Sequence, residues 1–116
     1  MNLEQPPGQR SAPDLSAALN QLWIRFLPDI LERVAILEAV AQARAAGDVA
    51  SEQRKAAHSA AHKLSGTLGT FNLARGTELA REFEQACATE ESFAATEAQQ
   101  LRVMAAEIRM LVDARN

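Results

Sequence analysis

The sequence predicts an all-α protein, an up-down antiparallel four-helix bundle with an additional N-terminal helix. Apolar residues recur every three or four positions along most of the chain, which is the spacing of one face of a helix. The 116 residues are 47% hydrophobic but only 4% aromatic, with much alanine and leucine, and this composition favours closely packed helices over sheets. Short connections between the periodic segments make consecutive helices antiparallel neighbours. The length fits one domain with one core.

The chain begins with a segment rich in helix-breaking residues. Residues 1–13 contain three prolines and one glycine among polar residues, so we expect a flexible lead-in there and the bundle domain over residues 14–116. Asp14 can cap the first helix. Pro28 is expected to end or bend that helix and to serve as the first residue of the next. The apolar stripe expected on the first helix is Leu15, Leu19, Leu22 and Phe26.

The second and third helices are bounded by turn signals. The second is expected to end at Gly47, a common helix terminator, and the third to start at Asp48 or Ser51. Asn72 is placed to adopt the left-handed conformation that closes the third helix. The expected buried positions are Ile30, Leu31, Val34, Leu37 and Val40 or Ala41 on the second helix, and Ala57, Ala60 or Ala61, Leu64, Leu68 and Phe71 on the third.

The C-terminal part of the chain predicts two further helices. One begins near residues 73–75, a turn follows at residues 89–92, and the last helix covers residues 92–114. Cys87 is the single cysteine, so we interpret it as a small buried hydrophobe and not as half of a disulfide. Trp23 is interpreted as a core or capping residue. The expected buried positions are Leu79, Ala80, Phe83, Ala86 and Cys87, then Phe93, Leu101, Met104, Ile108 and Leu111.

Charge and hydropathy argue against several classes of protein. The net charge of −3 is unsuited to a general nucleic-acid binder, which carries a basic excess. No apolar run approaches the roughly 20 residues of a membrane span, and no basic segment followed by an apolar run marks a signal peptide. We therefore expect a cytoplasmic protein without nucleic-acid or membrane partners, either free-standing or part of a longer protein. We also expect it to be a monomer.

One face of the third helix has an unusual composition. With 3.6 residues per turn, His62 lies opposite the stripe that contains Leu64, and Arg54 and Lys63 flank it. Gly66 follows one turn later, although glycine inside a helix costs about 1 kcal/mol relative to alanine. This pattern favours a flat surface where a second protein comes close to the imidazole. The face around His62 is small, polar or basic and consists of Lys55, His58, Ser59, Ser65, Gly66 and Gly69.

The segment around His62 resembles the recurring core of histidine phosphotransfer (HPt) domains, Ala-His-x-Leu-Lys-Gly. It departs from that core at Ser65, where the family usually has a lysine, and Lys63 instead follows the histidine directly. The resemblance covers most of the chain, from about residue 14 to residue 112. The matching positions are Ala61, His62, Leu64 and Gly66.

The resemblance implies a function in two-component signal transduction. His62 is expected to accept a phosphoryl group from the aspartate of a receiver domain, in a response regulator or a hybrid sensor kinase. It then passes the group to another receiver, as an intermediate of a phosphorelay. Such a carrier has no kinase activity of its own and needs no cofactor, because the receiver supplies Mg²⁺.

The neighbours of His62 are expected to support this transfer. Gly66 and Gly69 give clearance for an in-line approach of the partner. Lys55 and Lys63 can stabilise the added phosphoryl charge, and Ser65 can donate a weaker hydrogen bond than the family's lysine. The expected phosphoryl-support and docking surface comprises Lys55, His58, Ser59, Lys63, Ser65, Gly66 and Gly69.

The residues by themselves leave other functions open. The main alternative is a helical adaptor that docks a signalling partner without being phosphorylated, because Ser65 replaces the usual lysine. A metal site on the i, i+4 pair His58 and His62 lacks the glutamate of the metalloprotease motif and an evident third ligand. An enzyme that uses His62 is disfavoured, since no acid, nucleophile or metal can be placed near it. We interpret the glutamates of the fourth helix as solubilising; they are Glu78, Glu82 and Glu84.

Overall fold

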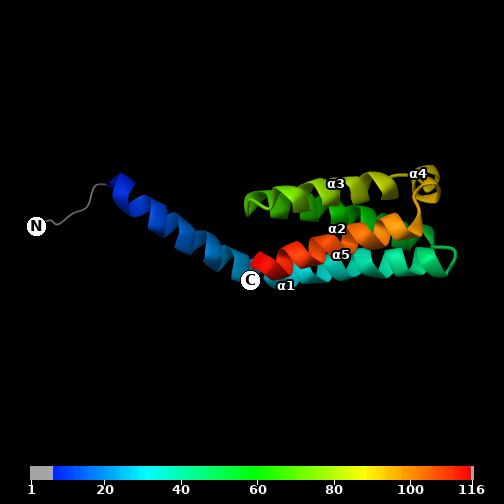
Figure 1. Cartoon of the computed structure of the whole chain (residues 1–116), viewed down its shortest axis with the longest axis horizontal. Coiled ribbons are helices and arrows are strands. Elements are labelled where there is room, and N and C mark those ends of the chain that lie inside the picture. Colours follow the sequence, from blue (N-terminus) through cyan, green and yellow to red (C-terminus); the bar gives the residue numbers. More distant parts are fainter. Residues whose placement is uncertain (1–6, 116) are drawn as a thin grey trace, which may run out of the picture.

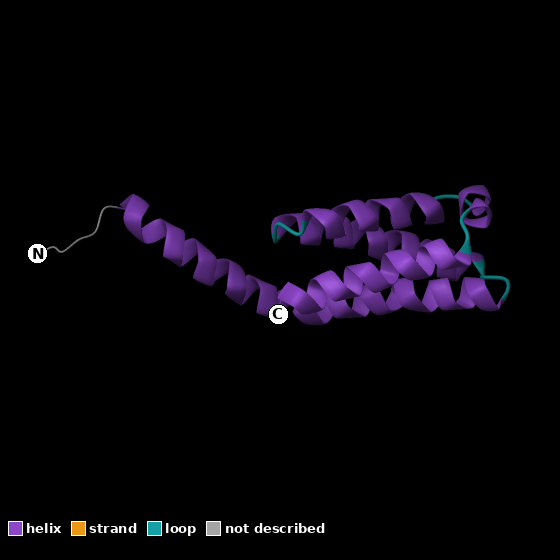
Figure 2. Cartoon of the chain, in the orientation of Figure 1, coloured by secondary structure: helices purple, strands orange, loops and turns teal. Residues whose placement is uncertain are grey.

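The structure, a computed structural model, describes residues 7–115, with side chains described from Leu15 onward. Every regular element in that range is a helix, as Figure 2 shows. The all-α prediction is therefore confirmed. The helices are α1 (Pro7–Ala46), α2 (Ser51–Thr70), α3 (Ala74–Cys87), α4 (Glu90–Ala95) and α5 (Ala98–Arg115).

Four of these helices form the bundle, and α4 is a short element at one end of it (Figure 1). The most extensive contacts join α2 to α3, followed by α1 to α5 and α1 to α2, whereas α3 and α5 touch less closely. The helices therefore surround the core in the order α1, α2, α3, α5. Neighbouring helices are antiparallel, as their short connections require.

The two N-terminal helices predicted on either side of Pro28 are one continuous helix, α1, of 40 residues. Pro28 removes one backbone donor and therefore bends a helix when it does not end it; α1 changes direction where it joins the bundle (Figure 1). The helix starts at Pro7, so residues 7–13 of the expected lead-in are helical. Residues 1–6 lie outside the described part, and flexibility of the lead-in stays a prediction.

The first half of α1 extends beyond the bundle, and this changes its burial. Leu15, on the projecting part, is 62% exposed. Phe26 lies beside the C-terminal end of α2, with its ring centroid 6.4 Å from that of Phe71, and is still 41% exposed. Trp23 is the residue that is fully covered there. Its ring meets the edge of Phe71 at a centroid distance of 5.2 Å, and the Arg115 guanidinium lies 5.0 Å from the Trp23 ring.

The predicted core is confirmed along the bundle. The apolar faces of α2 and α3 are buried at every expected position, and the second half of α1 follows its prediction with Leu31 partly buried. Met104 and Leu111 on α5 are also partly buried. The fully buried large side chains are Ile30, Val34, Leu37, Leu64, Leu68, Leu79, Phe83, Leu101, Ile108 and Val112.

A glycine allows the close approach of α3 to α2. Asn72 adopts the predicted left-handed conformation, with φ of 61°, and reverses the chain between the two helices. Gly76 follows in the first turn of α3 and is buried. A Cβ at this position would lie 3.0 Å from Leu68 Cδ1, which is tighter than ordinary packing. The sequence analysis assigned no role to this glycine.

The last helix predicted over residues 92–114 is divided into α4 and α5 by a break at residues 96–97. Thr89 Oγ1 accepts from Ser92 N at 2.9 Å, and Ser92 Oγ accepts from Thr89 N at 3.0 Å, so a reciprocal cap starts α4 inside the expected turn. Glu97 N donates to Gln100 Oε1 at 2.9 Å at the start of α5. These local side-chain caps favour two helices over one.

Two arginines and one cysteine close the bundle end that carries α4. Arg54 Nη1 donates to the Cys87 carbonyl at 2.6 Å, so Arg54 caps the C-terminus of α3 and does not flank His62. Arg44 Nη2 donates to the Ala94 carbonyl at 3.3 Å. Burial raises the pKa of the Cys87 thiol to about 11, so Cys87 is the inert buried residue that was predicted.

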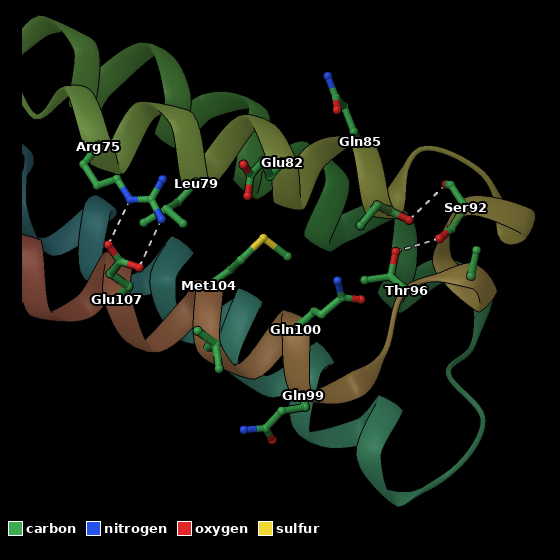
Figure 3. A pocket seen from close by; sticks show the side chains of 13 residues that line it. Arg75, Leu79, Glu82, Gln85, Ser92, Thr96, Gln99, Gln100, Met104 and Glu107 are labelled. Atoms are coloured by element: carbon green, nitrogen blue, oxygen red, sulfur yellow. Dashed lines mark hydrogen bonds and ion pairs between the residues drawn. The ribbon is translucent and has the colours of Figure 1, made fainter.

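A groove runs along the loosely packed seam between α3 and α5 (Figure 3). Met104 and Leu79 lie within it, and the ion pair between Arg75 and Glu107 crosses one end, with Nε and Oε2 2.9 Å apart. The carboxylates of Glu107 and Glu78 raise the pKa of the exposed Arg75 guanidinium. The seam is not adjacent to α2, so this groove lies away from His62.

Replacing Gly76 with alanine should destabilise the protein. The new methyl group meets fully buried Leu68, and the overpacking outweighs the gain in helix propensity, so we expect a net loss of about 1–2 kcal/mol. Gly66→Ala is the matched control, because a Cβ there meets nothing within 4 Å, and it should stabilise by about 0.4–1 kcal/mol. Urea denaturation measures both. Equal stability of the two variants would contradict the close-packing role of Gly76.

Candidate functional site

His62 lies on the outward face of α2, and its side chain is 71% exposed. The opposite face of the same helix is held in the core by Ala57, Ala61, Leu64 and Leu68. The helix therefore presents the imidazole to solvent without any need for a loop. This is the orientation that helical spacing predicted.

Glu84 of α3 orients the imidazole of His62. Its Oε2 lies 2.9 Å from His62 Nδ1, which is a short hydrogen bond, and Glu84 is only 24% exposed. An ionised carboxylate can only accept, so the neutral ring carries its proton on Nδ1. Nε2 then keeps its lone pair, and no described residue hydrogen-bonds to it. The sequence analysis was wrong to treat Glu84 as merely solubilising and to place no acid near His62.

His58 lies beside the same carboxylate. Its Nε2 is 3.9 Å from Glu84 Oε2, which is too long for a hydrogen bond but within the range of an ion pair when His58 is protonated. The His58 side chain is 40% exposed, one turn before His62. The expectation that His58 flanks His62 therefore holds for its position, and Glu84 connects the two imidazoles.

A hollow of about 410 Å³ on the α3 side of His62 is lined by a basic side chain that the sequence analysis missed. This side chain is Arg81, which lies three residues before Glu84 on α3. It lines the hollow together with His62, Ser65 and Glu84. Ser65 does not present a free hydroxyl proton there, because its Oγ donates to the His62 carbonyl at 2.7 Å. The Ser65 hydroxyl proton is therefore used in a backbone hydrogen bond, and Arg81 is the basic side chain of this hollow.

A second hollow, of about 360 Å³, opens on the α1 side of His62. Lys63 and Gly66 line it, and Phe26 of α1 forms an apolar wall. Gly66 faces open space, which agrees with a role in access. Gly69 differs, because a Cβ there would contact Thr77 Oγ1 at 3.5 Å, so it lies at the joint between α2 and α3.

The remaining predicted site residues are solvent-facing. Lys55 and Ser59 are exposed on the turns of α2 that precede His62, and Lys63 is exposed immediately after it. Among the described residues, no group of three or more histidine, cysteine, aspartate or glutamate side chains could hold a metal ion. None of the helices in this range has the length and hydropathy needed to cross a bilayer.

Comparison with known proteins identifies a family for this chain. The family model described as Hpt domain matches residues 13–114. The chain is also 35% identical, over 68 residues, to Protein RcaC of Microchaete diplosiphon. That alignment covers 59% of this chain but 10% of the relative, so the chain corresponds to a small part of RcaC. No solved structure matches significantly.

Removal of the Glu84 carboxylate should change the tautomer of His62. In the native protein the neutral ring is expected to hold its proton on Nδ1, and Glu84→Ala removes the acceptor that favours this form. The ¹⁵N chemical shifts of the ring, measured well above the usual titration range of histidine, report the tautomer directly. Glu82→Ala is the matched control on the exposed face of α3 and should leave the shifts unchanged. Identical shifts in native protein and Glu84→Ala would contradict the assignment.

Proposed function

The chain belongs to the Hpt domain family, and on that premise we propose that it is a phosphorelay intermediate whose His62 carries the phosphoryl group. The observation that carries this proposal is the state of the imidazole. His62 is 71% exposed and bound to Glu84 through Nδ1, so Nε2 is the atom open to a partner. The partner is a receiver domain of a response regulator or of a hybrid sensor kinase.

The proposed step is an in-line displacement at phosphorus. The lone pair of His62 Nε2 attacks the phosphorus of an aspartyl phosphate, the N–P bond forms, and the P–O bond to the aspartate breaks. The aspartate leaves with the electron pair as a carboxylate. The proton on Nδ1 stays in the hydrogen bond to Glu84, which stabilises the positive charge of the phosphorylated ring. Attack by a second receiver aspartate reverses these bond changes.

The surroundings of His62 support such a transfer electrostatically. Arg81 lines the same hollow as Ser65, so we infer that it supplies the cation that the family usually places at the serine position. Lys55 and Lys63 are exposed, and exposed charges contribute at most about 1 kcal/mol each to docking. Arg81 is exposed as well, so its assignment to chemical support rests on the hollow that it shares with His62 and Ser65, and the two lysines are assigned to docking.

The rest of the proposal concerns the setting of the reaction. The domain acts as a carrier without kinase activity and without a resident cofactor, and Mg²⁺ belongs to the receiver. It acts in the cytoplasm as a monomer, and no nucleic acid or membrane takes part. The competing function is an adaptor that docks a receiver and is never phosphorylated, which the Ser65 substitution favours.

Substitution of His62 tests carrier against adaptor. Incubation with phosphorylated receiver domains should label the native protein, and His62→Gln should abolish the label because the nucleophile is gone. Helicity and melting temperature should barely change, since the side chain is exposed. His58→Gln is the matched control and should still be labelled. Receivers that bind the native protein without labelling it would support the adaptor. If His62→Gln keeps the label and His58→Gln loses it, the phosphorylated residue is His58 and not His62.

Bulk at Gly66 should block transfer without unfolding the bundle. A leucine there projects over the preceding turn toward the imidazole, because helical side chains lean toward the N-terminus. Gly66→Leu should therefore lower the transfer rate by orders of magnitude, whereas Gly66→Ala slows it only modestly. Transfer rate and melting temperature are measured on the same two proteins. A folded Gly66→Leu protein that transfers at the native rate would show that the partner approaches from another side.

A further inference from the structure

The bundle end where α1 departs carries a cluster of three aromatic rings. Phe71, which closes α2, meets Trp23 edge to face at a centroid distance of 5.2 Å and lies 6.4 Å from Phe26. Trp23 and Phe71 are buried, whereas Phe26 is 41% exposed. The two buried rings therefore support a third ring that a partner can touch.

A cation from the last turn of α5 holds this cluster. The Arg115 guanidinium lies 5.0 Å from the ring centroid of Trp23 and 5.9 Å from that of Phe71, which is the range of cation–π contacts. Its Nη2 also donates to Asn20 Oδ1 at 3.1 Å. Arg115 therefore fastens both buried rings and α1 from a single side chain, which is itself half-buried.

Two rings of the cluster also line the hollow of about 360 Å³ on the α1 side of His62. Phe26 and Phe71 form its apolar wall, and Gly66 leaves it open. Arg115 is not among the residues that line this hollow. Any influence of Arg115 on the hollow therefore passes through the rings.

The hydroxyl groups that line this hollow are already used as donors. Thr67 Oγ1 donates to the Lys63 carbonyl at 3.0 Å, and Thr70 Oγ1 donates to the Gly66 carbonyl at 3.2 Å. With an aromatic wall and satisfied hydroxyl groups, the hollow suits an apolar side chain of a partner. Dispersion contacts weaken as soon as a gap opens between two surfaces, so such a hollow depends on where its rings stand.

We propose that Arg115 is a positioning residue for receiver docking. It holds Trp23 and Phe71, these rings support Phe26, and the cluster keeps the hollow in the shape that accepts an apolar side chain of the receiver. This inference rests on the proposed function, because the partner is the receiver that approaches His62. The effect is on docking and not on the chemistry, since the contacts of Arg115 within the described residues are with the cluster and Asn20.

Transfer from a phosphorylated receiver, measured over a range of receiver concentrations, separates docking from chemistry. Arg115→Gln should raise the half-saturating receiver concentration about five-fold and leave the maximal rate unchanged, because the cation–π contacts are lost. Arg115→Lys should restore most of the loss, since a cation remains beside the rings. Arg109→Gln is the matched control. It removes another tie between α5 and α1, the hydrogen bond of 2.6 Å from Arg109 Nε to Glu38 Oε2, and should leave both values unchanged.

Removal of the exposed ring tests whether Arg115 acts through the cluster. Phe26→Ala should also raise the half-saturating concentration. Arg115→Gln added to Phe26→Ala should then have little further effect, because the ring through which Arg115 acts is gone. Independent, additive losses, or an unchanged value in Phe26→Ala, would overturn the proposal.

Nuclear Overhauser contacts between the Phe26 and Phe71 rings measure the cluster without a receiver. They should weaken in Arg115→Gln and persist in Arg115→Lys and Arg109→Gln. Unchanged ring contacts in Arg115→Gln, or equal losses of docking in Arg115→Gln and Arg109→Gln, would contradict the positioning role.

Failure of the proposed function gives a different result. Receivers that bind the native chain without labelling it would refute phosphotransfer by His62, and the dissociation constants of the same variants then test Arg115 with the same expected ratio. A lower maximal rate at an unchanged half-saturating concentration would place the effect of Arg115 at His62 and refute the docking role alone. A native chain that binds no receiver would refute both.

Discussion

The close contact between α2 and α3 fixes the relative position of these two helices, and much of the rest of the structure depends on it. Gly76 removes the side chain that would keep α3 away from Leu68, and the left-handed Asn72 makes the connection tight. A tight helical hairpin has one register, so contacts farther from the turn follow from it. Those contacts are Thr77 with the Ser65 carbonyl, Glu84 with His62, and Arg54 with the Cys87 carbonyl.

This register divides the work at the site between two helices. The buried face of α2 holds the backbone beneath His62, and α3 supplies the carboxylate that selects one ring nitrogen. The substitution at Ser65 is easier to understand in this light. Its hydroxyl donates to the His62 carbonyl of its own helix, and Arg81 of the neighbouring helix lines the same hollow as Ser65. In the proposed function, Arg81 takes the role that a lysine at the Ser65 position has in the family.

Much of this arrangement could be predicted from the sequence, and the failures have physical causes. Periodicity identifies the face that leaves water, so the buried positions of α2 and α3 and the outward direction of His62 followed from it. Periodicity does not indicate which residue of a neighbouring helix a polar side chain contacts. Glu84 was therefore wrongly interpreted as only a solubilising residue. A signal was present, because His62 lies ten residues before Asn72 and Glu84 twelve residues after it, which places them across the hairpin. The continuity of α1 and the break before α5 depend on local bends and caps that apolar spacing does not register.

The exit points of the chain constrain how this domain can be joined to anything else. Arg115 Nη2 donates to Asn20 Oδ1 at 3.1 Å, so the end of α5 is fastened to the part of α1 that leaves the bundle (Figure 1). A module fused before α1 or after α5 would be attached at the same end of the bundle. The opposite end of the bundle, with Arg54 and α4, would stay free of either attachment. The projecting half of α1 would act as a stiff arm that sets the distance between an upstream module and the imidazole.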